Sequence, residues 1–411
     1  MARHYFDWAA TAVPGPGEFA HTLNGAVPFG NPSSVHAEGK AARAALEAAR
    51  SRCAKTLGVK AEELYFTSGG TEANAIVLFS LLCKPGIFRR ENENEQSPAG
   101  PLVNKSAVLL YSAAEHPSIR ENASALEQLG VPCASIGVGA DGRVSEITLE
   151  KALAKNPAAR MAAVMAVNNE TGAINDMKAL AAVINKSGDK APIHLHCDAV
   201  QAAGKIPLDF HGWGIDSASL SAHKLGGSRG TGLLWLKSPL APLFRGGGQE
   251  RKIRPGTENT AGAMKLAEEM ERHVVPLGKN AELPPVYTEA AERMKTLLLK
   301  LQSTGFFIPI PKDRGEEDSR FSPWILQGAF RNRSGKTIPG EVLARALDEK
   351  GFAVSTGSAC SSRSVKRPVL EAMGLDEETS RGGIRISQGW STTMEEIHSL
   401  AGAITALLNT L

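Results

Sequence analysis

The sequence predicts an α/β protein whose core is a mostly parallel β-sheet covered by helices. Short apolar or β-branched runs alternate with Ala-, Leu- and Glu-rich stretches of helical composition. The successive pairs are ELYFT before EANAIVLFSLL, SAVLLYS before SIRENASALEQL, and MAAVMAV before MKALAAVINKS, and the run PIHLHCDA follows them. This rhythm is typical of βα repetition, which builds parallel sheets.

The length of 411 residues predicts two domains, because a single hydrophobic core usually stops growing below this size. A helix is expected over residues 38–57, with Gly58 as its C-cap, at the start of the larger domain. The βα pattern gives way to a glycine-rich stretch at residues 245–262, after which a new helical run begins. We place the domain boundary in this stretch.

Composition and charge exclude several classes of protein. The 46 basic and 43 acidic side chains nearly balance, which leaves no footprint for nucleic acid. The first residues lack the apolar core of a signal peptide and no apolar run approaches a membrane span, so we expect a cytoplasmic protein. The five cysteines form no CxxC pair, so neither a disulfide framework nor a metal site is indicated. Residues 84–106 are polar and are predicted to form a surface loop.

Two nucleotide-binding motifs are matched only superficially. The run GVGADG at residues 137–142 fits GxGxxG, but an Asp-Gly turn follows where a helix should begin. The run SGKT at residues 334–337 resembles the end of a P-loop, yet Phe330 occupies the position of the first glycine. Neither motif therefore predicts a nucleotide site.

The segment TSGGTE at residues 67–72 lies between a predicted strand and a predicted helix. Its glycines allow close approach of an anion, and the helix N-terminus offers free N–H groups. Taken alone, an ordinary βα turn is the simpler interpretation.

Asp198 and Lys224 are the first candidates for chemistry. Asp198 ends a predicted strand, where a carboxylate could keep a pyridinium nitrogen protonated, although taken alone a helix N-cap is the better interpretation. Lys224 precedes the glycine-rich run LGGSRG and suits Schiff-base formation, although a solvated surface lysine is the default.

Cys360 is the candidate nucleophile. It lies in the small-residue run STGSACSSR, and Arg363, Lys366 and Arg367 follow it, which favours the reactive thiolate. The simpler alternative is an incidental small residue. The other four cysteines fall in predicted helices or strands and are expected in the core.

Ten segments in one order resemble the cysteine desulfurases, which belong to the class V group of fold-type I pyridoxal-phosphate enzymes. The resemblance runs from Tyr5 to about Ile397. The segments are YFDWAAT (5–11), GNPSSVH (30–36), FTSGGTEAN (66–74), EH (115–116), VNNETGAI (167–174), HCDAVQAAGK (196–205), SLSAHKLGG (219–227), GGGQERKIRPGTEN (246–259), STGSAC (355–360) and IRIS (384–387).

The resemblance implies a role for each matched residue. Lys224 would carry pyridoxal 5′-phosphate as a Schiff base, and Arg385, assisted by Asn31, would bind the substrate carboxylate. Thr257 would reach the phosphate of a neighbouring subunit, which implies a homodimer. The other implied cofactor contacts are Asp198 with the ring nitrogen, His116 stacked on the ring, Asn168 and Gln201 with its substituents, and Gly70, Thr71, Ser221 and His223 with the phosphate.

The implied fold has a large cofactor-binding domain over residues 16–260 with a mainly parallel seven-stranded sheet. A small α+β domain would combine residues 1–15 and 261–411. The implied reaction removes sulfur from L-cysteine, giving L-alanine and a persulfide on Cys360 for an acceptor protein that docks near this residue. Lys224 and His116 would act with Cys360 in catalysis.

Two other functions compete with this one, and the sequence argues against the second. A selenocysteine lyase or another class V lyase would carry the same Lys224, Asp198 and Arg385. A non-catalytic scaffold has no physical need for the complete set of catalytic residues. The sequence leaves open whether the sulfur serves iron–sulfur cluster assembly, tRNA modification or a general pool.

Overall fold

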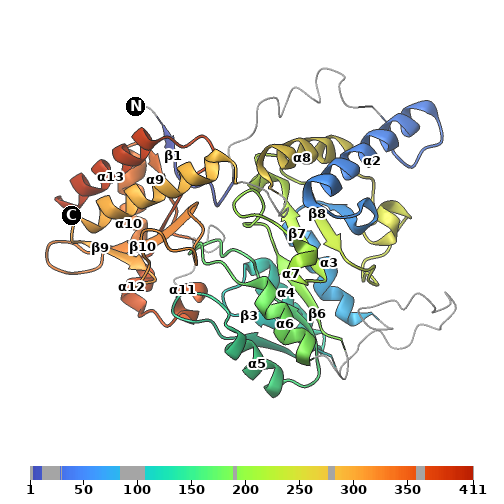
Figure 1. The fold of residues 1–411 in the computed structure, drawn as a ribbon, viewed down its shortest axis with the longest axis horizontal. Helices are drawn as coiled ribbons and strands as arrows, with labels where there is room; N and C mark the ends of the chain where they lie inside the picture. The colour runs from blue at the N-terminus through green and yellow to red at the C-terminus, as the bar shows by residue number, and fades with distance from the viewer. Residues whose placement is uncertain are drawn as a thin grey trace.

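The computed structural model describes residues 3–11, 28, 30–83, 107–187, 192–275, 283–357 and 366–410. The predicted loop at 84–106 and the predicted nucleophile Cys360 lie outside these residues. Figure 1 shows one group of elements built from the last third of the chain together with the N-terminal strand, and another built from the rest of the first two thirds.

The larger group contains a seven-stranded sheet in the order β2-β8-β7-β6-β5-β3-β4. The strands β7, β6, β5, β3 and β4 pair in parallel, whereas β8 is antiparallel to both of its neighbours. This confirms the predicted mainly parallel sheet of seven strands. The strands are β2 (Leu64–Thr67), β3 (Val108–Ser112), β4 (Cys133–Ile136), β5 (Ala159–Ala163), β6 (His194–Asp198), β7 (Ser217–Ser221) and β8 (Gly232–Leu236).

Helices cover both faces of this sheet. They are α2 (Ala37–Leu57), α3 (Gly70–Phe79), α4 (Pro117–Gln128), α5 (Glu146–Lys155), α6 (Met177–Ser187), α7 (Phe210–Trp213) and α8 (Thr260–His273), with short 3-10 turns at η1 (Ala61–Glu63), η2 (Ser80–Leu82), η3 (Ala222–Lys224) and η4 (Gln249–Lys252). The helix predicted over residues 38–57 agrees with α2 to within one residue. The predicted C-cap Gly58 adopts a φ of 67°, and its N–H donates to the carbonyls of Ala54 and Lys55.

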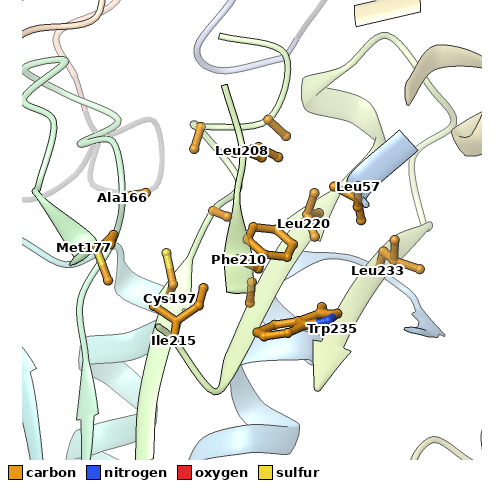
Figure 2. Packing of buried hydrophobic residues seen from close by; sticks show 14 of the residues in the cluster. Leu57, Ala166, Met177, Cys197, Leu208, Phe210, Ile215, Leu220, Leu233 and Trp235 are labelled. Carbon is orange, nitrogen blue, oxygen red and sulfur yellow. The ribbon is translucent and has the colours of Figure 1, made fainter. Parts of the chain in front are cut away.

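Two apolar layers sandwich the sheet because side chains alternate along each strand. In β5, Ala162 packs in the layer beneath α2, α6 and α8, whereas Met161 packs in the layer beneath α3 and α4. Figure 2 shows part of the first layer, where Phe210 and Trp235 pack near Leu57 and Leu233. The ring centroids of Phe210 and Trp235 lie 5.2 Å apart.

The smaller group has a separate apolar core. An antiparallel sheet orders β12 (Ile384–Ser387), β10 (Ile325–Phe330) and β9 (Phe307–Ile310), and β1 (His4–Tyr5) pairs in parallel with β11 (Phe352–Ala353). Its helices are α9 (Pro285–Gln302), α10 (Gly340–Glu349), α11 (Pro368–Ala372), α12 (Glu377–Arg381) and α13 (Met394–Leu408).

The helix α8 follows the predicted domain boundary at residue 260 but packs with the large core. Its Ala263, Leu266 and Met270 belong to the layer that α2 covers, and Figure 1 shows the two helices side by side. We therefore propose that the change between the two cores comes after α8. Across the described residues, the structure contains no helix with the length and apolarity needed to span a membrane.

Candidate active site

A cavity of about 280 Å³ opens where β6 and β7 end and α3 begins. This is the edge at which open α/β sheets bind their ligands. The side chains and backbone that line it come from eight segments of the chain: Ala9, Ala10, Gly70, Thr71, His116, Pro117, Ser118, Met165, Val167, Asn169, Asp198, Val200, Gln201, Ser221, His223, Lys224, Gly357 and Arg385. Most of the predicted site residues therefore lie around one cavity.

Lys224 ends the short turn η3 directly after β7. Its Nζ donates hydrogen bonds of 2.7 Å to the carbonyl oxygens of Ala9 and Ala10. The backbone N–H of Ala9 in turn donates to Oγ of Ser387 in β12 at 3.0 Å. The N-terminal segment thus links the small sheet to the lysine and holds the amine at the cavity.

Asp198 is the last residue of β6, and its carboxylate is buried at the cavity. Its Oδ1 accepts from the N–H of Val200 at 3.0 Å, and its Oδ2 accepts from Nδ2 of Asn74 at 2.9 Å. The contact with Val200 caps the following turn, so the capping and ligand-binding interpretations of this residue are compatible. A carboxylate in this position can accept a further bond from a ring N–H.

His116 is the N-cap of α4 and lines the same cavity. Its Nδ1 accepts from the N–H of Ser118 at 3.1 Å and lies 2.9 Å from Oγ of Ser118. Burial lowers the pKa of His116, and nearby Lys224 lowers it further, whereas Asp198 opposes this shift. The imidazole is therefore neutral at neutral pH, with its proton on Nε2.

The start of α3 forms an anion cradle beside the main cavity. Gly70 is its first residue, and a Cβ there would lie 2.6 Å from Cγ2 of Val200, so a side chain has no room. The adjoining hollow is also lined by Thr71, Ser221, His223 and Arg229. Free N–H groups at a helix N-terminus favour a phosphate. Burial, with Lys224 and Arg229 nearby, lowers the pKa of His223 to about 4.

These groups fit pyridoxal 5′-phosphate. The amine of Lys224 can condense with its aldehyde, and the Asp198 carboxylate can accept from its ring nitrogen. His116 lines the same cavity, and the α3 N-terminus offers donors to the phosphate.

Gln201 lines the cavity as predicted, and a lysine that the sequence analysis did not single out holds it. Nε2 of Gln201 donates to the Ala9 carbonyl at 2.8 Å, while its Oε1 accepts from Nζ of Lys205. Lys205 is buried, and burial, followed by the charges of Lys224 and Arg385, holds its pKa well below the usual value. The sequence signal for Lys205 is its place at the end of HCDAVQAAGK.

The structure places Asn168 differently from its expected role beside the cofactor ring. Its Nδ2 donates to the carbonyl of Ala114 at 2.9 Å, and its Oδ1 accepts from the N–H groups of Glu170 and Thr171. The next residue, Asn169, lines the cavity instead. The buried Oδ1 of Asn169 has no hydrogen-bond partner in the described part of the chain.

Arg385 reaches the cavity from β12 and is buried. Its Nη1 donates to the Asn169 carbonyl at 2.9 Å, and its Nη2 donates to Oδ1 of Asp7 at 2.7 Å. Among the described residues, its buried Nε lacks a hydrogen-bond partner. Asp7 was not singled out from the sequence, and its pairing leaves Arg385 with a donor for a substrate carboxylate.

Two further predicted residues, Asn31 and Thr257, do not line the main cavity either, and a third, Cys360, cannot be placed there. Asn31 is exposed, and its Oδ1 accepts from the N–H of Ser33 at 2.9 Å. Thr257 is exposed and lines a separate hollow of about 70 Å³ with Gly230 and other residues. Cys360 lies outside the described residues, although Gly357, three positions earlier, lines the main cavity. The roles of all three stay predictions.

The fold and this set of side chains define a pyridoxal-phosphate-dependent enzyme of fold type I. The family model described as aminotransferase class-V matches residues 4–400. The chain therefore belongs to the class-V aminotransferase family.

Relatives and solved structures agree with this family. The chain is 33% identical to cysteine desulfurase IscS of Dictyoglomus turgidum, with 90% of this chain and 85% of the relative covered. It is 34% identical to a cysteine desulfurase of Cereibacter sphaeroides, with 100% and 97% covered. A solved NifS-like protein is 30% identical with a TM-score of 0.80, and both chains are covered completely.

Proposed function

We propose that this protein is a cysteine desulfurase that converts L-cysteine to L-alanine and leaves the sulfur as a persulfide on Cys360. The observation that carries the proposal is the meeting of Lys224, Asp198 and Arg385 around one cavity. The cysteine desulfurases that resemble it over most of its length support the same activity.

Pyridoxal phosphate, when bound, supplies an aldehyde that condenses with amines and a ring that accepts electrons from the substrate Cα. The residues that would hold it are Lys224 at the aldehyde, Asp198 at the ring nitrogen and His116 at the ring face. Gly70, Thr71, Ser221 and His223 would hold the phosphate, and Gln201 would lie at a ring substituent.

Substrate binding depends on Arg385. Its buried Nε has no partner among the described residues, and Nη2, which donates one N–H to Asp7, keeps a second N–H. Two donors therefore remain for a carboxylate, a group that guanidinium matches with a two-donor fork. Asp7 and the Asn169 carbonyl fix the guanidinium plane. With the carboxylate held there, Nζ of Lys224 is the base within the cavity that can move the proton on the substrate Cα.

Sulfur transfer depends on Cys360. Its thiolate attacks the substrate sulfur, so that a new S–S bond forms while the Cβ–S bond breaks. The electron pair of the broken bond stays with the substrate carbon, which takes up protons and leaves as L-alanine. Three peptide units allow at most about 11 Å between the Cα atoms of Gly357 and Cys360, and Gly357 lines the cavity.

The proposal includes a homodimer in the cytoplasm. Thr257 is exposed beside its own hollow, where a second copy could approach it. Next to it, the exposed side chains of Leu243 and Phe244 border an apolar groove that also contains Ile76. The four described cysteines are free thiols, as in a reducing compartment. A sulfur acceptor would dock near Cys360.

The test measures alanine and sulfide released from L-cysteine in the presence of a reducing thiol. The unmodified protein and Cys133→Ala should release both in equal amounts, because the Cys133 thiol is half-buried and its pKa is raised to about 12 by burial. Cys360→Ala should keep the bound cofactor and release neither. Full activity of Cys360→Ala refutes the nucleophile, and inactivity of all three proteins refutes the proposed substrate. Parallel rates on selenocysteine separate a selenocysteine lyase.

A further inference from the structure

Asn74, in the first turns of α3, lies behind the cavity and is completely buried. Its Nδ2 donates to Oδ2 of Asp198 at 2.9 Å and to Oγ of Ser118 at 2.8 Å. Its Oδ1 lies 2.8 Å from Nε2 of His196 and accepts from Oγ of Ser219 at 2.5 Å. Both donors and both acceptor positions of this amide are therefore used.

The orientation of the Asn74 amide follows from the chemistry of its neighbours. A carboxylate only accepts hydrogen bonds, so the atom facing Asp198 must be the nitrogen. Oδ1 then faces His196, whose Nε2 must carry a proton and whose Nδ1 must accept. Oγ of Ser217 lies 2.7 Å from this Nδ1 and donates the hydrogen bond to it.

The chain of hydrogen bonds continues one residue further. Because the Ser217 hydroxyl donates to His196, it can only accept from Nε2 of His194, which lies 2.7 Å away. Burial lowers the pKa of His194 to about 4 and that of His196 to about 3, so both rings are neutral in this chain. His194, His196 and Asp198 alternate along β6, which puts their side chains on one face of the sheet.

We propose that Asn74 is a positioning residue that fixes the Asp198 carboxylate for the cofactor ring nitrogen, and that His196 in turn fixes Asn74. The inference rests on the proposed function, because it concerns the carboxylate that would hold the ring. The Asn74 amide also donates to the Ser118 hydroxyl, which lies 2.9 Å from Nδ1 of His116. The same amide is therefore linked through Ser118 to His116. One buried amide thus aligns the groups at the nitrogen and at the face of the ring.

The test compares two cofactors on the purified apoprotein. One is pyridoxal phosphate, and the other is its analogue in which C–H replaces the ring nitrogen. If Asn74 acts through Asp198, Asn74→Ala weakens the binding of pyridoxal phosphate roughly tenfold or more, the effect of one lost charge-assisted hydrogen bond. The binding of the analogue, which offers Asp198 no N–H, changes by less than about twofold by the same reasoning. Dissociation constants are measured by quenching of tryptophan fluorescence.

Two variants of His196 keep the test decisive if Asn74→Ala does not fold. His196→Gln retains an N–H donor toward Oδ1 of Asn74, whereas His196→Leu has none. The preference for pyridoxal phosphate over the analogue should persist in His196→Gln and fall in His196→Leu. Equal weakening of both cofactors in Asn74→Ala, or an unchanged preference in His196→Leu, overturns the inference. Failure of the unmodified protein to bind pyridoxal phosphate instead overturns the proposed function and this inference with it.

Discussion

Replacement of Glu250 by glutamine should destabilise the large domain strongly. Glu250 lies in η4 and forms a two-bond ion pair with Arg50 of α2, in which Nη1–Oε2 and Nη2–Oε1 are both 2.7 Å. The side chains are 1% and 2% exposed. Oε2 of Glu250 also accepts from the N–H of Phe66 in β2 at 2.8 Å. The pair therefore ties η4, α2 and the strand before the anion cradle together.

The magnitude follows from burial. Glu250→Gln places an amide against guanidinium donors and leaves the buried charge of Arg50 paired only with Glu47, whose side chain is 53% exposed. Loss of the buried counter-ion costs about 3–5 kcal/mol. Domains of this size lose roughly 2–4 °C of melting temperature per kcal/mol, so the expected loss is roughly 6–20 °C. The φ of 44° at Glu250 adds to the cost of any rearrangement, because a non-glycine residue there is held only by its surroundings.

A second ion pair that includes an arginine of α2 provides a matched control. Arg52 of α2 pairs with Glu271 of α8 at 2.6 Å, but the two side chains are 42% and 43% exposed. Exposed pairs contribute about 0–1 kcal/mol, so Glu271→Gln should shift the melting temperature by at most about 4 °C. Thermal unfolding followed by circular dichroism compares the two variants. Similar melting temperatures for both variants would refute the argument from burial.

Three further outcomes are expected. Lys224→Ala should lose the covalent attachment of the cofactor, so borohydride reduction should fix pyridoxal phosphate to the unmodified protein and not to the variant. Arg385→Lys should raise the KM for L-cysteine at least about tenfold, because an ammonium group cannot form the two-donor fork; an unchanged KM would remove Arg385 from substrate binding. Burial lowers the pKa of His194 to about 4 and of His196 to about 3 from 6.5, so the unfolded state binds more protons below pH 6.5. Stability to urea should therefore fall on acidification from about pH 7 to about pH 5, by about 2 kcal/mol per histidine, and His194→Gln should reduce this loss.

The elements of the large domain were predictable because their signals are local. The helix α2 could be bounded by its composition and by Gly58, and β3, β5 and β6 coincide with the runs SAVLLYS, MAAVMAV and PIHLHCDA. The strands β7 (SASLS) and β4 (CASI) have no comparable apolar run. The domain boundary was harder to place. The glycine-rich stretch at 245–262 marks a change in composition, yet α8 packs back on the large core, and packing partners cannot be read from composition.

Much of the candidate site could be anticipated from the resemblance, but its supporting contacts could not. Two adjacent asparagines look alike in sequence, and only the path of the backbone decides that Asn169 rather than Asn168 lines the cavity. The partner of Arg385 is Asp7, 378 positions away, and no local pattern reports such a contact. In the sequence Lys205 resembles a solvated surface lysine. In the structure it is buried and donates a hydrogen bond to Gln201.

The path of the N-terminal segment constrains how the protein can be made. Residues 4 and 5 pair with Phe352 and Ala353, and the N–H of Ser387 donates to the carbonyl of Phe6 at 2.9 Å. The carbonyls of Ala9 and Ala10, which accept hydrogen bonds from the Lys224 amine, are therefore held in place by strands of the small domain. These strands leave the ribosome more than three hundred residues after Ala9 and Ala10. Contacts of such sequence separation form late in folding. A nascent chain should consequently remain inactive until its last third has been translated, and a ribosome-bound chain truncated before residue 350 should contain the lysine but no working site.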